Sequence, residues 1–411
     1  MELLVILAAV GTVAAWSGPE HQMVGRIASA FLAPETQAAL NSLLPSFDVP
    51  SDNITFPING NVSLMTTWAD TVKGKKVYGW SGAYHYIDYE DVTLLDVKNM
   101  SASVVACSKI IDEISCPAGV CIVPAIANYT NRADYANKRS DNERAEAILF
   151  LTHYLGDITQ PLHNCGKFLG GNNYLVKWNG SIFEPAPYQK YRHNMHFIWD
   201  QFMIEADIQD NYGNSFDKYV ASIIGDIMVG KYNSAAASWL TCQSPVKTDS
   251  GLVVKTVCPI EWSVEGNDLN CASVWDNTGS LDPANPTDDL YTNGYYAANK
   301  DIARLQLAKA GLRLAAALNT LVPAKPIDTY YSGFASVIPS KCTTTSAPLA
   351  ITTAAVAPVT TASGAVTAEA TTTASTAAVV APAPTTKVNL LSNASALTIS
   401  VAIVVALSLT L

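Results

Sequence analysis

Two histidine–aspartate pairs give the clearest chemical signal in the sequence. His153 and Asp157 are four residues apart, and His196 and Asp200 repeat that spacing in a second apolar stretch. In a helix, side chains four residues apart project from one face, so each pair offers an imidazole and a carboxylate to one point. A single pair could be a hydrogen-bonded part of the core. Two such pairs are hard to attribute to packing.

His163 follows the first pair closely. Pro161 cannot continue a helical hydrogen-bond ladder, so we expect the helix that carries His153 to end before it and the chain to turn. The turn would bring His163 near the face that carries His153 and Asp157. Two imidazoles and one carboxylate around a point suit zinc better than other common metals. The sequence therefore predicts a zinc site within residues 150–163.

The elements that position these residues are expected to be helices. Apolar residues recur at helical spacing in residues 19–32, 36–44, 120–135, 141–156, 196–208, 216–229 and 295–321. Residues 84–88 are predicted to be a short extended run, and residues 242–293 a cysteine-bearing loop. The expected fold class is therefore mainly α.

The two ends of the chain differ from its body. The apolar run before Trp16 ends in small residues and predicts a signal peptide over residues 1–15. Residues 16–340 would form one catalytic domain, and residues 341–392, rich in Ser, Thr, Ala and Pro, a disordered stalk. Residues 393–411 form a hydrophobic tail. Because no basic anchor follows it, we favour a lipid-anchor signal over a transmembrane helix.

Cysteines and sequons agree with a secreted or cell-surface protein. The eight cysteines are an even number, and Cys116 and Cys121 are close enough for a local disulfide. The other six cannot be paired from sequence; for Cys165 a metal role is an alternative to the disulfide that we favour. N-glycosylation is expected at Asn53, Asn61, Asn99, Asn128 and Asn179, and a further sequon lies at Asn393.

The histidine inventory indicates several metal ions rather than one. Of six histidines, only His193 has the context of an ordinary surface residue or of a residue that supports the metal ligands from behind. The other five lie in apolar or aromatic contexts near a carboxylate or near the expected mature terminus: His21, His85, His153, His163 and His196. The formal net charge of −10 argues against long-range attraction of nucleic acid, so any anionic substrate would have to be held locally.

In their order along the chain, these motifs resemble those of the zinc-dependent, single-strand-specific nuclease and 3′-nucleotidase family, which is related to the zinc phospholipases C. The resemblance covers Trp16 to about Leu321. It rests on Trp16 with His21, Trp68-Ala69-Asp70, His85-Tyr86-Ile87-Asp88, residues 125–129 and 150–163, Gly170-Gly171-Asn172 and His196-x-x-Trp199-Asp200. The resemblance implies a single multi-helix zinc-hydrolase domain of the phospholipase C/nuclease fold.

The resemblance also implies three zinc ions. The first would be held by Asp70, His85, His153 and Asp157. The second would be held by the α-amino nitrogen and carbonyl oxygen of Trp16, with His21 and Asp157. The third would be held by His163, His196 and Asp200. Because the amino group of Trp16 takes part, activity would depend on removal of the signal peptide.

Further roles come from the same resemblance. Asp70 and Asp157 would be catalytic through their metals, and Lys73 lies where the family places a basic residue beside the scissile phosphate. A solvated lysine at a helix end is an equal alternative for Lys73.

A base pocket is implied as well. Tyr86 would stack on the base, and Asp88 would accept from its exocyclic amine and favour adenine. Leu169 would form the opposite wall, and Asn172 would add a base or phosphate contact. Core packing is the alternative for Tyr86. A pocket for one base favours single strands, because a duplex must first be unstacked.

We therefore expect a secreted or surface-tethered hydrolase with a monomeric catalytic domain. It would cleave single-stranded DNA and RNA to 5′-phosphate products and act as a 3′-nucleotidase, with zinc activating water. A zinc phospholipase C is the alternative in chemistry, and an adhesin that keeps the metal site as scaffold is the alternative of another class. Asp88 and Asn172 favour the nuclease, because a lipid head group has no base edge for a carboxylate to read.

Overall fold

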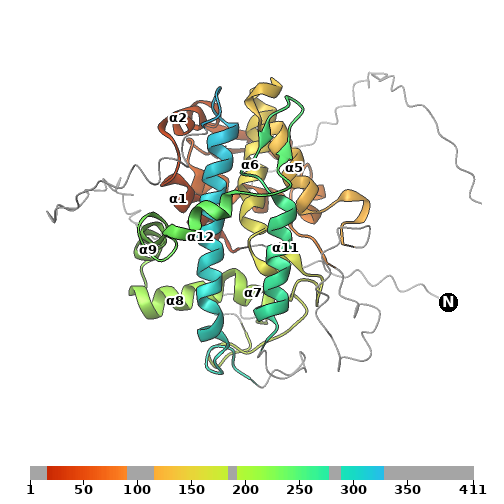
Figure 1. Ribbon diagram of the computed structural model, residues 1–411. Coiled ribbons are helices and arrows are strands. Elements are labelled where there is room, and N and C mark those ends of the chain that lie inside the picture. Colours follow the sequence, from red (N-terminus) through yellow and green to blue (C-terminus); the bar gives the residue numbers. More distant parts are fainter. Residues whose placement is uncertain (1–15, 90–114, 184–191, 277–287, 328–411) are drawn as a thin grey trace, which may run out of the picture. The chain divides into compact units, whose positions relative to one another are not determined.

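The computed structural model describes residues 16–89, 115–183, 192–276 and 288–327 (Figure 1). The expected signal peptide, stalk and C-terminal tail lie outside these residues, as do Asn99, Cys107 and Cys342. Within the described ranges, no helix is both long enough and apolar enough to cross a membrane.

Helices dominate the described part of the chain, which confirms the mainly α class. The α-helices are α1 (Gly18–Ser29), α2 (Pro34–Leu43), α3 (Val62–Met65), α4 (Trp68–Val72), α5 (Ile122–Ala133), α6 (Asp141–Asp157), α7 (Met195–Phe197), α8 (Met203–Tyr212), α9 (Phe216–Met228), α10 (Asn233–Ala236), α11 (Pro259–Leu269) and α12 (Tyr295–Leu321). Short 3₁₀ turns are η1 (Pro50–Asp52), η2 (Gly79–His85), η4 (Pro117–Gly119), η5 (Tyr135–Asn137), η6 (Pro161–Asn164) and η8 (Ala237–Leu240). Two π turns are η7 (Ile198–Phe202) and η9 (Asn270–Val274).

Strands are confined to two small antiparallel hairpins in the described residues. β1 (Ser46–Val49) pairs with β2 (Ile54–Pro57), and Phe47 lies opposite Phe56. β3 (Val246–Lys247) pairs with β4 (Val253–Val254). Neither hairpin contributes a candidate metal ligand, so the site depends on the helices and turns.

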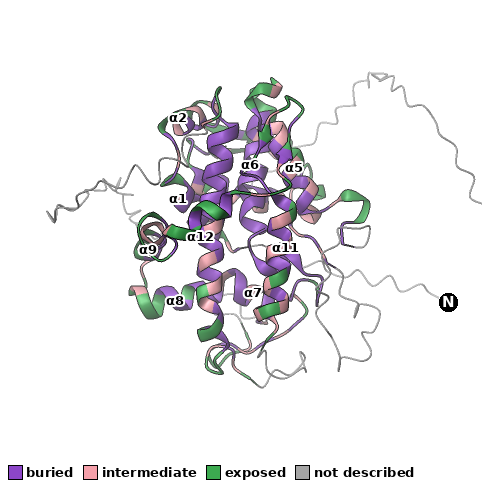
Figure 2. Cartoon of the chain, viewed as in Figure 1, coloured by how far each residue is buried: buried purple, intermediate pink, exposed green. Residues whose placement is uncertain are grey.

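The long helix α12 lies at the centre of the helical core. It packs against α1, α6 and α8, and most of its length is buried (Figures 1 and 2). Gly311 permits this packing, because a Cβ there would collide with the side chain of Ile27 and crowd the carbonyl oxygen of Val24 on α1. The arginines that α12 buries are paired, as burial of a charge requires: Arg304 with Asp226 and Arg313 with Glu265.

Helix α6 carries the first His–Asp pair. Its start is fixed by a capping box: the Ser140 hydroxyl accepts from the Glu143 N–H at 3.3 Å, and the Glu143 carboxylate accepts from the Ser140 N–H at 3.1 Å. All residues from Ala147 to Asp157 are buried. The helix ends at Asp157, before Pro161, as the sequence predicts.

Three segments differ from their prediction. Tyr84 and His85 belong to the 3₁₀ turn η2, so the extended run begins only at Tyr86, where φ is −147° and ψ is 171°. The helix predicted over residues 196–208 contains the π turn η7, which puts Asp200 in a widened turn. Residues 242–293 are not simply a loop, because they contain the hairpin β3–β4, helix α11 and the π turn η9.

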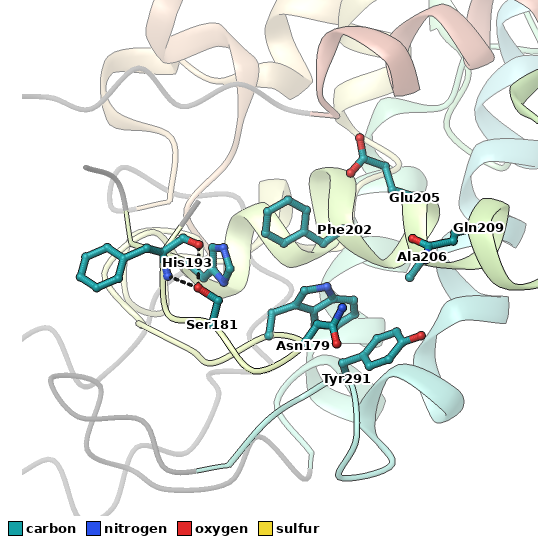
Figure 3. A pocket seen from close by; sticks show the side chains of 10 residues that line it. Asn179, Ser181, His193, Phe202, Glu205, Ala206, Gln209 and Tyr291 are labelled. Atoms are coloured by element: carbon teal, nitrogen blue, oxygen red, sulfur yellow. Dashed lines mark hydrogen bonds between the residues drawn. The ribbon is translucent and has the colours of Figure 1, made fainter. Parts of the chain in front are cut away.

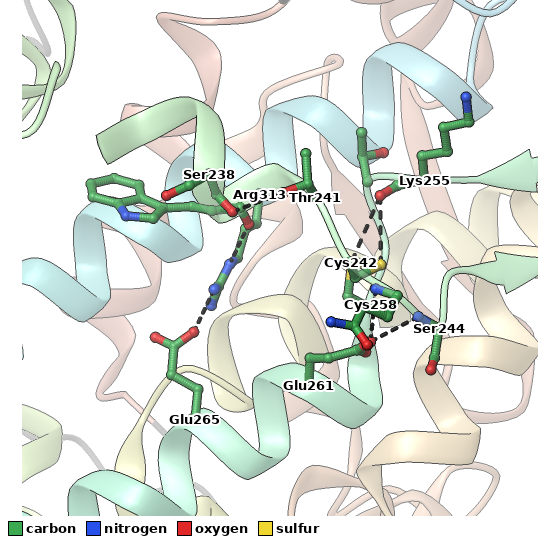
Figure 4. The surroundings of a disulfide bond; sticks show 12 residues. Ser238, Thr241, Cys242, Ser244, Lys255, Cys258, Glu261, Glu265 and Arg313 are labelled. Atoms are coloured by element: carbon green, nitrogen blue, oxygen red, sulfur yellow. Dashed lines mark hydrogen bonds and ion pairs between the residues drawn. A yellow bond between two sulfur atoms is a disulfide. The ribbon is translucent and has the colours of Figure 1, made fainter. Parts of the chain in front are cut away.

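Contacts with distant residues explain why α11 forms there (Figure 4). Cys242 and Cys258 form a disulfide directly before the helix. Glu265 on α11 accepts from the Arg313 guanidinium of α12 at 2.6 Å, and Arg313 also donates to the carbonyl oxygen of Trp239 at 3.2 Å. Pro259 stands at the first position of the helix, where its missing N–H costs nothing. These contacts are not visible in the local apolar pattern.

Candidate functional site

Asp157, at the end of α6, lies in the middle of a buried cluster. Its Oδ1 is 3.1 Å from His21 Nε2, and its Oδ2 is 2.8 Å from His85 Nδ1 and 3.2 Å from His153 Nε2. Asp70 Oδ1 lies 3.5 Å from His153 Nε2 and 3.7 Å from His85 Nδ1. Elements α1, α4, η2 and α6 thus bring five predicted ligands together.

A second cluster contains the other His–Asp pair. His196 Nε2 is 3.2 Å from Asp200 Oδ2 and 3.1 Å from His163 Nε2. Gln160 donates to Asp200 Oδ1 at 2.5 Å. The turn at Pro161 keeps His163 near the first cluster, since Asp157 and His85 contribute to its pKa, but the compact group that contains His163 does not include His153 and Asp157. The 3₁₀ turn η6 carries the His163 ring to His196 instead.

Backbone carbonyls decide which nitrogen of each imidazole carries a proton. His153 Nδ1 lies 2.6 Å from the Thr66 oxygen, His163 Nδ1 2.7 Å from the His85 oxygen, and His196 Nδ1 2.6 Å from the Gly170 oxygen. A carbonyl oxygen only accepts, so each of these nitrogens donates. In a neutral ring the Nε2 atom then has a lone pair.

These orientations create a conflict that a cation removes. His163 and His196 aim two lone pairs at each other across 3.1 Å, beside the buried carboxylate of Asp200. In the first cluster His21 Nδ1 and His85 Nε2 are buried without a hydrogen-bond partner. Unsatisfied buried polar atoms are costly. Neutral imidazoles and carboxylates therefore fit a metal ion, and zinc accepts this set of N and O donors.

Three groups of side chains are compact enough to hold an ion. They are His21, His153 and Asp157; Asp70, His85 and His153; and His163, His196 and Asp200. His153 belongs to two of the groups, so the first two would share ligands.

Burial governs the protonation of the ligands. Desolvation, with a contribution from His196, lowers the pKa of His163 to about 3, and desolvation with a contribution from His153 lowers the pKa of His21 to about 4. Burial also opposes charge on His153, but Asp157 and Asp70 outweigh it and raise its pKa to about 10. Burial raises the pKa of Asp200 well above its ordinary value. Neutral His21 and His163 keep the lone pairs that a metal needs.

The start of the described chain lies between the two clusters. The Trp16 side chain is fully buried, and its indole N–H donates to the Gly156 oxygen at 3.0 Å. The Ser17 N–H donates to the Asp200 oxygen at 3.2 Å. A Cβ at Gly156 would lie 3.0 Å from the His21 ring, so glycine lets α1 approach α6 closely.

Lys73 follows α4 and is not a solvated lysine. Its Nζ is 2.7 Å from Asp70 Oδ1, and its side chain is only 10% exposed. That exposure excludes the solvated alternative. The ammonium group therefore lies at the edge of the first cluster.

The predicted base-pocket residues lie next to the clusters. Ile87 N–H donates to the His163 oxygen at 2.9 Å and Gly166 N–H to the Tyr89 oxygen at 3.1 Å, so residues 86–89 run beside the loop that carries Leu169. Burial raises the pKa of Asp88 to about 6. Burial, and then the charge of Asp88, raise the pKa of Tyr86, which indicates that these two side chains are close.

The loop itself is held by local contacts. Leu169 has a positive φ of 55° and is 52% exposed. Asn172 donates its side-chain N–H to the Leu169 oxygen at 2.8 Å. The Asn172 amide nitrogen thus stabilises the turn, and the exposed Leu169 side chain is available for a ligand.

Comparison with known families decides the identity of this arrangement. The family model of the S1/P1 nucleases matches residues 16–323, the part of the chain that contains every candidate ligand. The chain belongs to the S1/P1 nuclease family.

Curated S1/P1 relatives align over most of their length. Nuclease P1 of Penicillium citrinum is 27% identical over 310 residues, which cover 74% of this chain and 97% of the relative. Nuclease S1 of Aspergillus oryzae is 30% identical over 315 residues, 76% of this chain and 93% of the relative. Endonuclease 3 of Arabidopsis thaliana is 27% identical over 331 residues, 79% of this chain and 95% of the relative.

Membership in the S1/P1 family confirms the resemblance. The protein is a hydrolytic nuclease that acts on phosphodiester bonds, and the family is zinc-dependent. The comparisons do not favour the phospholipase C alternative.

For His193 of this S1/P1 nuclease, the structure excludes the surface alternative. It is 3% exposed rather than on the surface, and its ring lies edge-on to Phe202 at 4.9 Å. It lines a pocket of about 630 Å³ with aromatic walls (Figure 3). The other aromatic lining residues are Trp178, Phe183, Phe202 and Tyr291. They come from separate segments, so no local pattern could reveal the pocket.

The predicted modification sites of the nuclease are accessible where the structure describes them. Asn53, Asn61, Asn128 and Asn179 are exposed, although Asn61 Oδ1 also accepts from the Ser63 N–H at 3.0 Å as a helix cap. Cys116 and Cys121 form a disulfide, whereas Cys165 is buried.

Proposed function

We propose that this nuclease cleaves single-stranded DNA and RNA to 5′-phosphate products, removes the 3′-phosphate of nucleotides, and uses three zinc ions. The observation that carries the proposal is the pair of facing imidazole nitrogens in each cluster beside a buried carboxylate. His153 Nε2 lies 3.0 Å from His85 Nδ1, and His163 Nε2 lies 3.1 Å from His196 Nε2. The family relation to nucleases P1 and S1 supports the substrate class.

The ligands divide between the ions as follows. Asp70, His85, His153 and Asp157 would hold one ion, Trp16, His21 and Asp157 a second, and His163, His196 and Asp200 a third. Asp157 suits a shared position, because Oδ1 faces His21 whereas Oδ2 faces His85 and His153. Bound zinc supplies Lewis-acid polarisation of a phosphoryl oxygen and lowers the pKa of water near it.

The protein's own groups orient the ligands and the phosphate. Gln160 holds one oxygen of Asp200 and leaves the other facing His196. Lys73 is paired with Asp70, so its ammonium can also contact a phosphate oxygen at the edge of the cluster. These contacts fix the ligands before substrate arrives, which lowers the reorganisation needed for catalysis.

Trp16 offers a direct test of the second ligand set. A form that begins at Trp16 is expected to exceed a form with one added glycine before Trp16 by at least about tenfold in kcat/KM, because the addition removes the α-amino ligand. The buried indole would hold Trp16 in place in both forms. Bound zinc per molecule should fall with activity. Equal activity and zinc content in the two forms would remove Trp16 from the ligand set.

Asp88 is expected to determine base preference and its dependence on pH. As a carboxylate, Asp88 accepts a hydrogen bond from the exocyclic amine of adenine, which favours adenine over uracil. As the pH falls through about 6, Asp88 becomes protonated and the preference for adenine declines. Asp88→Asn should lower the preference for 3′-AMP over 3′-UMP by about tenfold and remove its pH dependence. Asp301→Asn, at an exposed carboxylate on α12, is the control.

The stability effect of Asp88 has the opposite sign. Its folded pKa of about 6 lies above the ordinary value of 3.8, so ionisation of Asp88 disfavours the folded state. The free energy of unfolding contributed by this group therefore increases as the pH falls through that window.

A pH-independent base preference in the wild type would contradict the role of Asp88.

The reaction itself is tested with a soluble form of residues 16–340 that begins at Trp16. We expect cleavage of a single-stranded oligonucleotide to 5′-mononucleotides, slower cleavage of the matched duplex, and loss of both after chelation. Vesicles of phosphatidylcholine provide the alternative substrate. Hydrolysis of the lipid without cleavage of the oligonucleotide would replace the nuclease by a phospholipase C.

We also propose that the protein passes through the secretory pathway and is tethered at the cell surface by a lipid that replaces its C-terminal tail, with a monomeric catalytic domain. The disulfides Cys116–Cys121 and Cys242–Cys258 support an oxidising compartment. Release from cells by a glycolipid-specific phospholipase is the expected result. Retention in the membrane after that treatment would exclude the lipid anchor.

A further inference from the structure

The segment between Asp70 and His85 is basic in an acidic protein. Residues 71–87 contain three lysines and no aspartate or glutamate, whereas the whole chain has a formal net charge of −10. Both ends of the segment belong to the first cluster, because Asp70 precedes it and His85 lies in its last turn. Its positive charges therefore belong to a segment that begins and ends at the candidate active site.

Trp80 is the most exposed aromatic side chain of this segment. It lies on η2 and is 50% exposed. Its ring lies 5.7 Å from Tyr84 in an edge-on arrangement and 5.6 Å from Phe150. Tyr84 precedes the ligand His85, and Phe150 lies one helical turn before the ligand His153. The indole is thus held in place by aromatic neighbours close to the cluster while half of its surface stays exposed.

Two of the lysines have no anionic partner in the described part of the chain. Lys75 and Lys76 take part in no ion pair there, in contrast to Lys73, which pairs with Asp70. Val77, which follows them, is 42% exposed. Lys76 is exposed and Lys75 is half-buried, and both precede the exposed Trp80 by a few residues. Ammonium groups and an exposed aromatic ring on one segment are the combination that binds single strands without reading their sequence.

We propose that Trp80, Lys75 and Lys76 bind the nucleotides that adjoin the scissile bond on a single strand. This inference rests on the proposed function. Trp80 stacks on one base of the continuing strand, and the two lysines contact its phosphates. A ring that stacks on a base needs that base to be unstacked from its neighbours, so this surface adds to the preference for single strands.

The test compares two substrates of the same enzyme. A 3′-nucleotide ends at the cluster, whereas a single-stranded oligonucleotide continues beyond it. Trp80→Ala should lower the ratio of kcat/KM for the oligonucleotide to kcat/KM for the 3′-nucleotide by about tenfold, because the variant cannot stack on the base. Trp80→Phe, which keeps a ring, should recover most of the ratio. Val229→Ala, at a 73% exposed apolar side chain after α9, should leave both activities unchanged.

The lysines are tested by salt dependence. In Lys75→Gln/Lys76→Gln, the plot of log kcat/KM for the oligonucleotide against log salt concentration should become shallower by about 0.7 for each phosphate that the ammonium groups neutralise in the wild type. Lys218→Gln/Lys255→Gln, at exposed lysines elsewhere, should keep the wild-type slope.

The outcomes separate this inference from the proposed function. Suppose that the wild type hydrolyses both substrates. If Trp80→Ala then keeps the wild-type ratio of kcat/KM between the two substrates, and the double lysine variant keeps the wild-type salt slope, the surface does not bind the strand. Equal losses for both substrates also overturn the inference, because Trp80 then only covers Phe150. If the wild type hydrolyses neither substrate, the proposed function itself fails.

Discussion

Asp157→Asn is expected to reduce kcat/KM for single-stranded DNA by at least about a thousandfold, more than the 10- to 100-fold typical of groups that only support a metal ligand. Asparagine keeps the size of the side chain but loses its charge. Both carboxylate oxygens face imidazole nitrogens, at 2.8 to 3.2 Å. An amide nitrogen in either position cannot donate electrons to a metal. Bound zinc should therefore fall together with activity.

Asp207→Asn is the matched control for this change. Asp207 is 5% exposed, accepts from Asn211 at 2.7 Å and pairs with Lys300 at 3.2 Å, and has no histidine partner among the described residues. The Asp207→Asn variant should lose some free energy of unfolding and keep its bound zinc. Full zinc content and wild-type activity in the Asp157 variant would show that the buried carboxylate is structural and that the metal lies elsewhere.

Removal of the metal is expected to lower the unfolding temperature by on the order of 10 °C for each ion lost. Each ion bound at a concentration a thousandfold above its Kd contributes about 4 kcal/mol to the free energy of unfolding. Without ions, the His163 and His196 lone pairs face each other at 3.1 Å, and two ring nitrogens of the first cluster are buried without a partner. The binding free energy of the ions already contains this cost, because Kd is measured against the metal-free fold.

Calorimetry with and without a chelator measures this effect. Zinc added back in excess should restore the unfolding temperature, whereas magnesium, which prefers oxygen ligands, should not. Elemental analysis must show that the chelated protein is free of zinc. An unchanged unfolding temperature in zinc-free protein would mean that the clusters are stable without ions, contrary to the metal-site interpretation.

The sequence predicts the long helices well and the short elements poorly. Helix α12 has the predicted bounds, because its apolar residues recur over many turns, and α6 begins where Ser140 caps it. Helix α11 was not predicted, because a disulfide and the Glu265–Arg313 ion pair hold it. Tertiary contacts of this kind override weak local preferences.

In the candidate site, too, contacts within one helix are predicted from the sequence and contacts between distant segments are not. Spacing alone places His153 near Asp157 and His196 near Asp200, because one helical turn sets both distances. The partner of His163 depends on a 3₁₀ turn and on a distant helix, so spacing within residues 150–163 does not reveal His196 as its neighbour. The surroundings of His193 were not predicted, because they come from residues that are far apart in sequence. The complete ligand sets came from the family resemblance, and their roles stay predictions.

The hydrogen bonds that orient three of the histidines are made to backbone atoms, which affects how far the sequence can diverge. His153, His163 and His196 are oriented by the carbonyl oxygens of Thr66, His85 and Gly170. Every amino acid supplies a carbonyl, so substitution at residue 66 changes the side chain and leaves the acceptor in place. Much of the surrounding sequence can therefore be substituted during evolution without a change in the orientation of the imidazoles, provided that the backbone keeps its path. A chain only 27% identical to nuclease P1 can thus still present its histidines in this geometry.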